Sequence, residues 1–342
     1  MVDFDEQMMQ RCIQLAKNGL GKTYPNPMVG CVIVHDGKII AEGWHQKAGE
    51  PHAEVNAINQ IQNKEILKNS TLYVSLEPCA HHGKTPPCAD LIVHHQIQKV
   101  IVGTVDLFAK VNGLGIQKLK NAGVEVISGV LEKECRELNK RFFTFHQLKR
   151  PYVILKWAQT ANGFMATENG KQKWITNEFS KQLVHKWRTE EQSILVGTKT
   201  AEMDNPQLNS RLWNGNQPIR LVLDKDLKLN PDLHLFDRNQ RTIVFTKKEK
   251  LSQENLEFIK VLFDENLPNS ILDKLYELDI QSVIIEGGKK TLESFIRKDL
   301  WDEARIFTSP TIWDSGIKSP DFKGSLVETK TISTDKLEIF VR

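Results

Sequence analysis

Short apolar segments of strand length alternate with segments of helical periodicity along nearly the whole chain, and this alternation constrains the fold more than any other feature. Residues 29–34 indicate a buried strand, and Asp36-Gly37 then turns the chain into a second strand over 38–44. After this hairpin, strands and helices alternate, which favours a mixed or largely parallel sheet covered by helices. We therefore expect an α/β protein.

The pattern restarts after Lys149-Arg150-Pro151, so the sequence predicts two α/β domains with a boundary at roughly residues 146–151. We assign residues 1–147 to the first domain and 148–342 to the second. In the first domain, helices are predicted at 4–17, 53–61, 88–94, 116–122 and 131–145, and strands at 29–34, 38–44, 71–76, 99–103 and 124–127. In the second, strands are predicted at 152–157, 193–196, 219–223, 242–245, 282–285, 304–308 and 337–341, and helices at 270–278 and 291–300. A further helix is expected after an N-cap at Thr176, with an apolar stripe of Phe179, Leu183, Val184 and Trp187.

The charge of the chain argues against a nucleic-acid partner. The formal net charge of the 342 residues is only +3 at pH 7, and basic residues form no long run. Proteins that bind nucleic acid usually carry a clustered basic face. We therefore expect no nucleic-acid substrate.

The N-terminus and the cysteines favour a cytoplasmic location. The chain begins with an acidic, amphipathic segment where a signal peptide would be basic and then apolar, and no apolar run is long enough to cross a bilayer. Five cysteines in a chain of this length do not indicate a disulfide framework. Cys12, Cys31 and Cys135 lie in apolar-periodic segments, where we expect them to pack in the core.

The strongest local signal is His52-Ala53-Glu54, followed by Pro78-Cys79 and Cys88, which matches the recorded pattern of zinc deaminases. One imidazole and two thiolates leave a fourth zinc position open for water, as a catalytic site requires. Glu54 lies two residues after His52, so at the start of a helix its carboxylate can face that position and move protons without binding the metal. The sequence predicts His52, Cys79 and Cys88 as zinc ligands and Glu54 as the catalytic residue.

The spacing of the two cysteines departs from the simple pattern, because eight residues separate Cys79 from Cys88 instead of two. The structural alternative is a core histidine with two buried thiols. That alternative gives Glu54 no role, so we favour the metal site.

Three segments resemble the bifunctional deaminase/reductase family of riboflavin biosynthesis: residues 25–30 (PNPMVG), His52-Ala53-Glu54 and residues 77–88 (EPCAHHGKTPPC). In that family a long insertion between the cysteines is normal, and the resemblance covers essentially the whole chain. It implies a cytidine-deaminase-like first domain that removes the 2-amino group of 2,5-diamino-6-ribosylamino-4(3H)-pyrimidinone 5′-phosphate. It also implies a dihydrofolate-reductase-like second domain that uses NADPH to reduce the ribosyl group to ribityl, and a homo-oligomer, either a dimer or a tetramer.

By this resemblance, Asn26, His81 and the rest of the loop 81–84 would hold the pyrimidine and its sugar phosphate. A turn residue between two prolines is the alternative for Asn26. His81 and His82 could instead be further zinc ligands, although an open site needs only three. His45, His94 and His95 are expected to be surface or packing residues.

Two glycine-containing segments resemble the reductase half of the family: the one that begins at Gly197-Thr198-Lys199-Thr200, and Glu286-Gly287-Gly288. Glycines between a strand and a helix let backbone N–H groups approach a pyrophosphate, although a plain turn is the alternative for Gly287 and Gly288. Gly113-Leu114-Gly115 is superficially similar to a dinucleotide motif. Its third glycine is missing and it lies in the deaminase half, so we expect a loop leading into a helix there.

The resemblance assigns the remaining residues of the second site one by one. NADPH is expected against Ala158, Trp174, Thr200, Asp204, Gly287 and Gly288. The ribosyl phosphate and the ring are expected near Lys156, Arg188, Leu208, Arg211 and Glu286, with a solvated helix face as the alternative for Arg188. Lys225 follows the strand 219–223, where a cation could neutralise the 2′-phosphate of NADPH or could be a simple turn lysine.

One departure from the family leaves functional alternatives open. Where the family usually reads Ser-Leu-Asp-Gly, this chain has Thr160-Ala161-Asn162-Gly163. A ligand-binding protein whose reductase half has lost activity is therefore one alternative, and a deaminase of nucleosides or tRNA is another. For the acid that protonates the sugar during reduction, Lys156 and Asp204 are both candidates.

Overall fold

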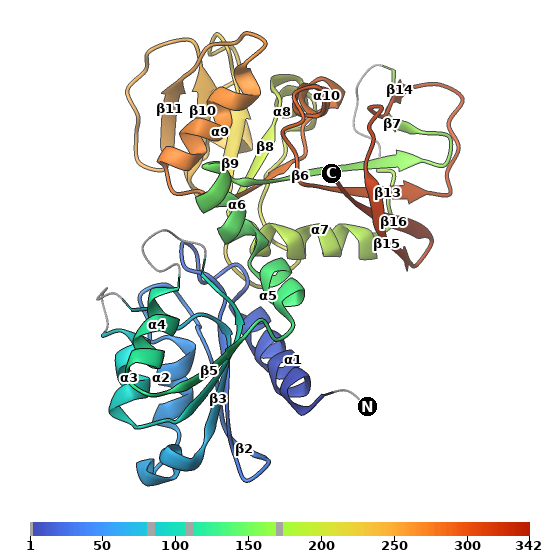
Figure 1. Cartoon of the computed structure of the whole chain (residues 1–342). Helices are drawn as coiled ribbons and strands as arrows, with labels where there is room; N and C mark the ends of the chain where they lie inside the picture. Colours follow the sequence, from blue (N-terminus) through green and yellow to red (C-terminus); the bar gives the residue numbers. More distant parts are fainter. Residues whose placement is uncertain (1–2, 81–85, 107–112, 169–173) are drawn as a thin grey trace. The chain divides into compact units, whose positions relative to one another are not determined.

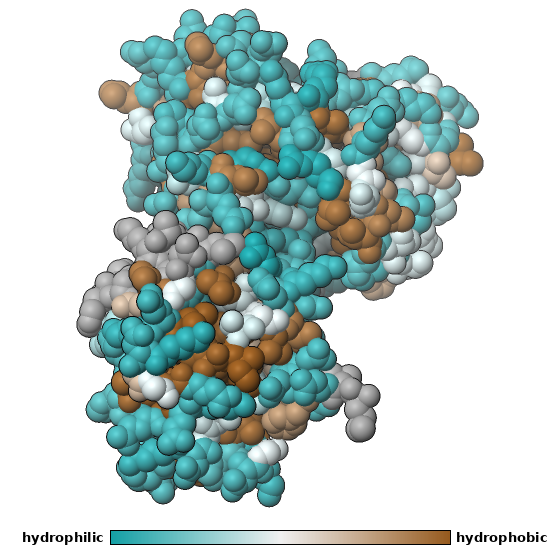
Figure 2. All heavy atoms as spheres, in the orientation of Figure 1, coloured by the Kyte–Doolittle hydropathy of each residue, from teal (hydrophilic) through white to brown (hydrophobic). Residues whose placement is uncertain are grey.

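The chain forms two compact units, Met1–Lys149 and Arg150–Arg342 (Figure 1). The computed structural model describes residues 3–80, 86–106, 113–168 and 174–342, so the predicted substrate residue His81 lies outside the described residues. Within those residues, no helix is both long and apolar enough to cross a membrane. The visible surface is mainly hydrophilic, with scattered hydrophobic patches (Figure 2), because most large apolar side chains lie in the cores of the two units.

The first unit contains a five-stranded sheet in the order β2-β1-β3-β4-β5. Its strands are β1 (Gly30–His35), β2 (Lys38–Trp44), β3 (Thr71–Leu76), β4 (Lys99–Thr104) and β5 (Glu125–Ser128). Strand β1 is antiparallel to β2 and β3, whereas β3, β4 and β5 run parallel. The turn between β1 and β2 places Asp36 at φ 47° and Gly37 at φ 71°, the left-handed backbone that an Asp-Gly pair favours. The predicted hairpin followed by parallel strands is confirmed.

Helices cover both faces of this sheet. They are α1 (Phe4–Ala16), α2 (Ala53–Asn59), α3 (Cys88–His94), α4 (Leu114–Asn121), α5 (Glu132–Leu138) and α6 (Lys140–Leu148), with 3₁₀ helices at Lys17–Gly19 and Lys64–Asn69. Helices α2, α3 and α4 share one core with alternate strand residues such as Ile33, and α1 and α5 share another with Val32. Cys12, Cys31 and Cys135 are fully buried in these cores, as predicted.

The prediction of a single helix over residues 131–145 is wrong, because the structure divides this segment into α5 and α6. The break falls at the buried Asn139, where φ is −104° and ψ is 23°. The Asn139 side chain accepts a hydrogen bond from Met28 N and donates one to Met28 O, each over 2.8 Å. Asparagine often bonds to backbone groups in this way instead of continuing a helix.

The second unit contains a nine-stranded sheet in the order β11-β10-β9-β8-β12-β6-β13-β16-β15. Its strands are β6 (Tyr152–Thr160), β8 (Ser193–Val196), β9 (Ile219–Leu223), β10 (Thr242–Thr246), β11 (Leu256–Lys260), β12 (Ser282–Ile285), β13 (Glu303–Ser309), β15 (Ser325–Ile332) and β16 (Asp335–Val341). From β11 to β13 every neighbouring pair is parallel, and β16 and β15 are antiparallel additions. Strands β7 (Phe164–Ala166) and β14 (Ile317–Lys318) pair separately. The carboxyl ends of the parallel strands therefore share one edge, where α/β sheets usually bind ligands.

Helices also cover both faces of the second sheet, which confirms the α/β class for this half. They are α7 (Glu178–Glu190), α8 (Thr198–Asp204), α9 (Leu267–Glu277) and α10 (Lys289–Arg297), with a 3₁₀ helix at His234–Phe236. Helices α9 and α10 pack in one core, and α7 and α8 pack in the other.

The predicted N-cap of α7 is wrong by one residue. Asn177 caps the helix, because its side-chain oxygen accepts a hydrogen bond from Ser180 N over 3.0 Å. The predicted apolar stripe is also only partly buried, because Phe179 is 64% exposed while Val184 and Trp187 are buried. Threonine and asparagine are both good caps, so residue type alone could not choose between neighbouring positions.

Candidate functional site

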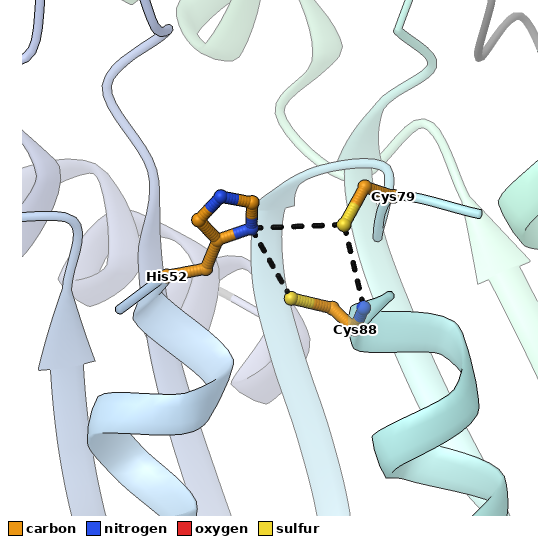
Figure 3. A group of neighbouring side chains, drawn as sticks. All are labelled: His52, Cys79 and Cys88. Carbon is orange, nitrogen blue, oxygen red and sulfur yellow. Dashed lines mark hydrogen bonds between the residues drawn. The ribbon is translucent and has the colours of Figure 1, made fainter. Parts of the chain in front are cut away.

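Three predicted ligands converge from three elements of the first unit (Figure 3). His52 lies directly before α2 with an extended backbone (φ −72°, ψ 168°), and its ring nitrogen Nδ1 faces the two cysteine sulfurs. Cys79 follows strand β3, and Cys88 is the first residue of α3. The strand and the two helix starts therefore bring together side chains that lie far apart in the sequence.

The spacing of the three ligand atoms fits one zinc ion. His52 Nδ1 lies 3.6 Å from Cys79 Sγ and 3.3 Å from Cys88 Sγ, and all three ligand atoms lie within 4.8 Å of one another. A tetrahedral zinc, with bonds of about 2.3 Å to sulfur and about 2.0 Å to nitrogen, holds such atoms about 3.5 Å apart. Thiolate and imidazole donors are also those that zinc prefers.

The surroundings of Cys79 favour its thiolate form. The pKa of Cys79 is lowered to about 4, because Cys88 and His52 hydrogen-bond to its sulfur. Contact with Cys79 raises the pKa of His52, and contact with Cys79 together with burial raises the pKa of Cys88. One sulfur of the pair thus readily loses its proton, and a divalent cation can displace the other proton on binding.

Glu54 lies beside this cluster and not in it. The residue is in the first turn of α2 and its side chain is buried, and this burial raises the pKa of its carboxyl. The nearby His52 and Cys88 oppose this rise in pKa, yet in the part of the chain that the structure describes Glu54 does not join the potential metal ligands. A buried carboxyl next to a metal site is well placed to hold or release a proton.

The sequence assigned no function to His45, which the structure places next to His52. The His45 ring is buried, and its centroid lies 5.3 Å from that of His52. His45 Nε2 lies 3.1 Å from Asn26 Nδ2, and His45 Nδ1 lies 3.2 Å from Pro51 O. The predicted substrate residue Asn26 is therefore linked to the cluster through His45. The only sequence signal for a functional role of His45 was its position directly after β2, because functional residues often follow strand ends.

In the second unit, Lys156 on β6, Arg188 on α7 and Glu286 after β12 form a nearly buried cluster of charges. Arg188 Nη2 donates to Glu286 Oε2 over 2.9 Å, and Lys156 Nζ lies 3.9 Å from Glu286 Oε1. Burial opposes ionisation of Glu286, but Arg188 and Lys156 together lower its pKa, and burial lowers the pKa of Lys156. Two cations beside one anion give a net positive charge that suits an anionic ligand.

Several buried atoms of this cluster, and one of His185 one turn before Arg188 on α7, have no hydrogen-bond partner among the described residues. Among the described residues, Arg188 Nε, Glu286 Oε1 and His185 Nδ1 are buried without a hydrogen-bond partner. Buried polar atoms are normally paired, so unpaired ones within a charge cluster indicate a place that a ligand or water completes.

The other predicted substrate residues lie on the segment after α8. Arg188 Nη1 donates to Asn209 O over 3.0 Å, and Arg211 Nη1 donates to Asn209 Oδ1 over 3.0 Å. Leu208 is buried in the core, whereas Arg211 is exposed. The structure thus joins Lys156, Arg188 and Glu286 directly. Leu208 and Arg211 lie on either side of Asn209, which contacts Arg188.

The glycine turns at the sheet edge pack closely against each other. Gly287 and Gly288 connect β12 to α10, and Gly197 connects β8 to α8. A Cβ atom on Gly287 would lie 2.9 Å from Thr291 Cβ and 3.0 Å from Gly197 N, so no side chain fits between the turns. Gly288 N donates to Thr200 Oγ1 over 2.9 Å. Two turns that open into helix N-termini at the carboxyl ends of neighbouring parallel strands fit a pyrophosphate.

The remaining predicted cofactor residues are spread over the second unit. Ala158 lies on β6, and Asp204 ends α8, where burial raises the pKa of its carboxyl. Lys225 is exposed after β9, and Trp174 is 61% exposed with the ammonium of Lys181 lying 4.3 Å from its ring centroid. Within the described residues, neither Trp174 nor Lys225 hydrogen-bonds to the charge cluster, so their contacts with NADPH stay predictions.

The altered turn at Asn162 is intact. Asn162 Oδ1 accepts hydrogen bonds from Thr160 Oγ1 over 2.8 Å and from Trp313 N over 3.3 Å. Asn162 Nδ2 donates to Trp313 O over 2.7 Å, a bond that a carboxylate cannot make. The amide therefore matches its surroundings in this chain, and Gly163 keeps the left-handed backbone that the turn needs, at φ 81°.

Comparison with known proteins gives consistent matches for both units. The family model described as "Cytidine and deoxycytidylate deaminase zinc-binding region" matches residues 2–104, and "RibD C-terminal domain" matches residues 151–331. The chain is 42% identical to the riboflavin biosynthesis protein RibD of Aquifex aeolicus over 98% of this chain and 96% of that protein. It is 33% identical to RibD of Escherichia coli over 91% of this chain and 89% of that protein.

Solved structures match over the same length. A diaminohydroxyphosphoribosylaminopyrimidine deaminase/5-amino-6-(5-phosphoribosylamino)uracil reductase from Thermotoga maritima superposes with a TM-score of 0.91 at 40% identity, covering 99% of this chain and 98% of that one. RibD from Acinetobacter baumannii gives a TM-score of 0.90 at 35% identity, with the same coverage. The chain belongs to the RibD family, the bifunctional deaminase–reductases of riboflavin biosynthesis.

Proposed function

We propose that the chain catalyses two successive reactions on one pyrimidine ribosyl phosphate. The first unit deaminates 2,5-diamino-6-ribosylamino-4(3H)-pyrimidinone 5′-phosphate, and the second reduces the ribosyl group of the product to ribityl with NADPH. The observation that carries this proposal is the convergence of His52, Cys79 and Cys88 beside the buried Glu54. Family membership supplies the substrate.

In the deamination, Glu54 is proposed to move the protons. The His52–Cys79–Cys88 cluster would hold zinc, which would make a water acidic enough to serve as the nucleophile near neutral pH. The Glu54 carboxylate takes a proton from the water as the water oxygen bonds to C2 of the ring, and passes this proton to the ring nitrogen. It then passes the remaining hydroxyl proton to the 2-amino group, which leaves as ammonia while the C2 carbonyl forms. Asn26, held by His45, is proposed to orient the pyrimidine.

In the reduction, the charge cluster is proposed to bind and orient the substrate. The turns at Gly197 and Gly287 would hold NADPH, which would supply the hydride for C1′ of the sugar. Arg188 and Lys156 hold anionic groups of the substrate, and Glu286 keeps both cations in place. Lys156 and Asp204 are the proposed sources of the proton for the sugar, because burial moves the pKa of each towards neutrality.

One assay tests both reactions. Purified protein is incubated with the diaminopyrimidine ribosyl phosphate, with and without NADPH, and the products are identified by mass. We expect the deaminated ribosyl compound without NADPH and the ribityl compound with it. Turnover of cytidine, adenosine or tRNA in place of this substrate contradicts the proposed deamination. NADPH binding without oxidation in the presence of the deaminated intermediate contradicts the reduction.

We also propose that the protein works as a homo-oligomer in the cytoplasm, with activities divided at residues 1–147 and 148–342. All five cysteines are free, which suits a reducing compartment. Light scattering coupled to size exclusion, performed on the full chain, measures the oligomeric state. Monomers at micromolar concentration would contradict this part of the proposal.

A further inference from the structure

Glu77, two residues before the predicted ligand Cys79, is buried and its carboxylate is surrounded by backbone donors. Its Oε1 atom accepts hydrogen bonds from Gly115 N over 2.8 Å and from Ile116 N over 3.2 Å, and its Oε2 atom accepts from Gly113 N over 2.9 Å and from Asp106 N over 3.1 Å. Three of these four donors belong to the beginning of α4. The Glu77 side chain thus connects the segment after β3 to the N-terminus of α4.

This contact explains the Gly113-Leu114-Gly115 motif, whose expected role as a loop leading into a helix is confirmed. The free N–H groups and the dipole at a helix N-terminus favour an anion. In this chain the anion is the Glu77 carboxylate itself, so the motif serves an internal contact.

The backbone between Glu77 and Cys79 also rests directly on α4. A Cβ atom on Gly115 would lie 1.9 Å from Pro78 O and 3.2 Å from Glu77 Oε1, so only glycine permits this approach. Glu77 N donates to Thr104 O over 3.0 Å, which fixes the same segment to the end of β4. The direction in which the chain enters Cys79 is therefore set by α4 and β4.

Cys79 needs such support more than the other two ligands do. His52 directly precedes α2 and Cys88 begins α3, so each is held by a helix of its own. Cys79 lies beyond the end of β3, after Glu77 and Pro78, in a segment without regular structure. We propose that Glu77 is a positioning residue for the metal site, which holds Cys79 Sγ at the distance from His52 Nδ1 that the metal requires. This inference rests on the proposed metal role of the three ligands.

The test uses the full-length Glu77→Gln protein. The amide keeps one acceptor oxygen and turns an NH₂ group towards backbone N–H donors, so at least two of the four bonds are lost. We expect zinc to bind about 10- to 100-fold more weakly, the usual effect of removing a group that orients a metal ligand. Zinc affinity is measured by competition with a chromophoric chelator, and the thiolate-to-cobalt absorption bands of the cobalt-substituted protein should shift. NADPH-dependent reduction by the second unit should be unchanged.

Ser75→Ala is the matched control for general destabilisation. Ser75 is buried on the same strand, and its Oγ atom accepts a hydrogen bond from Gly30 N over 3.1 Å. Its loss should lower the melting temperature and leave the zinc affinity and the cobalt spectrum at parental values. If Glu77→Gln behaves like Ser75→Ala, with lower melting temperature and parental metal properties, Glu77 is only structural and the inference is overturned.

A milder variant covers the case in which Glu77→Gln does not fold. Glu77→Asp keeps the charge but is one methylene shorter, and it too should bind zinc more weakly with shifted cobalt bands, whereas parental binding overturns the inference. The parental protein separates the two proposals. If it binds zinc but yields no deaminated product, the proposed function fails while the role of Glu77 is still decided by the variants.

Discussion

At the scale of single residues, His52 and Glu54 are two positions apart, and their proposed roles differ because of where the helix begins. His52 precedes α2 and faces the sulfurs, whereas Glu54 lies in the first turn and is buried beside them. The sequence pattern predicted both positions, since a ligand and a carboxylate at this spacing fall at a helix start. What it could not predict was the contact of His45 with His52, because only the fold brings their ring centroids to 5.3 Å from each other.

Replacing Glu54 with Gln should abolish deamination without removing the metal. The amide is nearly isosteric but cannot take up a proton, so we expect deamination to fall about 10²- to 10⁴-fold. Zinc content by elemental analysis should stay at the parental value, and reduction of the deaminated substrate should continue. Loss of zinc together with both activities would show that Glu54 is structural.

His185 should make the second unit sensitive to acid. Burial, followed by Arg188 and Arg211, lowers the pKa of His185 to about 4, against 6.5 when it is exposed. The unfolded chain therefore binds a proton between these values that the folded chain does not, so stability is lost as the pH falls through this window. Between pH 7 and pH 5 the unfolding free energy of the parent should therefore fall. The fall should be about 1–2 kcal/mol smaller in the His185→Gln variant than in the parent.

Denaturant unfolding of the parent and the His185→Gln variant at both pH values measures this difference. The variant and the parent share every other titrating group, so subtracting their unfolding free energies isolates the histidine. Equal losses in the two proteins would mean that His185 is not held neutral by its neighbours.

At the scale of elements, α7 depends on its cap. Asn177 accepts from Ser180 N, and its Nδ2 donates to Ile332 O over 2.7 Å, so Asn177→Ala should cost about 1–2 kcal/mol of unfolding free energy. Thr176→Ala is the control, because the sequence favoured Thr176 and the structure gives it no capping bond. Urea unfolding of both variants decides between the two positions; a larger loss for Thr176→Ala would contradict the structure.

The elements that could be predicted best are buried strands bounded by clear breaks. Strands β2, β3, β8, β9 and β12 and helix α3 have the predicted bounds, because each is a compact apolar run or follows a strong motif. Strand β15 was missed, since most of its residues are exposed and polar and no alternation marks them. Helix α8 was missed because it is short, and the break at Asn139 because a tertiary contact with Met28 causes it.

The two candidate sites also differed in how well the sequence predicted them. The three predicted metal ligands have a distinctive chemistry, so residue types and the His-x-Glu and Pro-Cys motifs were sufficient to predict the cluster that the structure brings together. The cluster of Lys156, Arg188 and Glu286 joins a strand, a helix and a turn that are spread over residues 156–286 of the sequence. Only the family resemblance pointed to it. Its charges are common residue types with no pattern of their own.

At the scale of the whole molecule, each unit has its own core, so removal of zinc should affect only one of them. A strong chelator should lower the unfolding free energy of the first unit by about 4 kcal/mol if zinc was present at a thousandfold excess over its dissociation constant. The second unit should keep its unfolding transition and its reductase activity.

Differential scanning calorimetry with and without chelator, followed by zinc addition, measures this effect. Cys79→Ala is the companion variant and should show the chelated behaviour without chelator. A downward shift of both transitions would indicate that the two units do not unfold independently.

The two cysteines of the metal cluster are supported from different parts of the first unit: the segment that leads into Cys79 rests on α4 and β4, and Cys88 begins α3. These supports all lie outside residues 81–85, which belong to the stretch of chain that joins the two cysteines. Evolution or an engineer could rebuild this stretch to admit a different pyrimidine and leave the hydrolytic centre untouched.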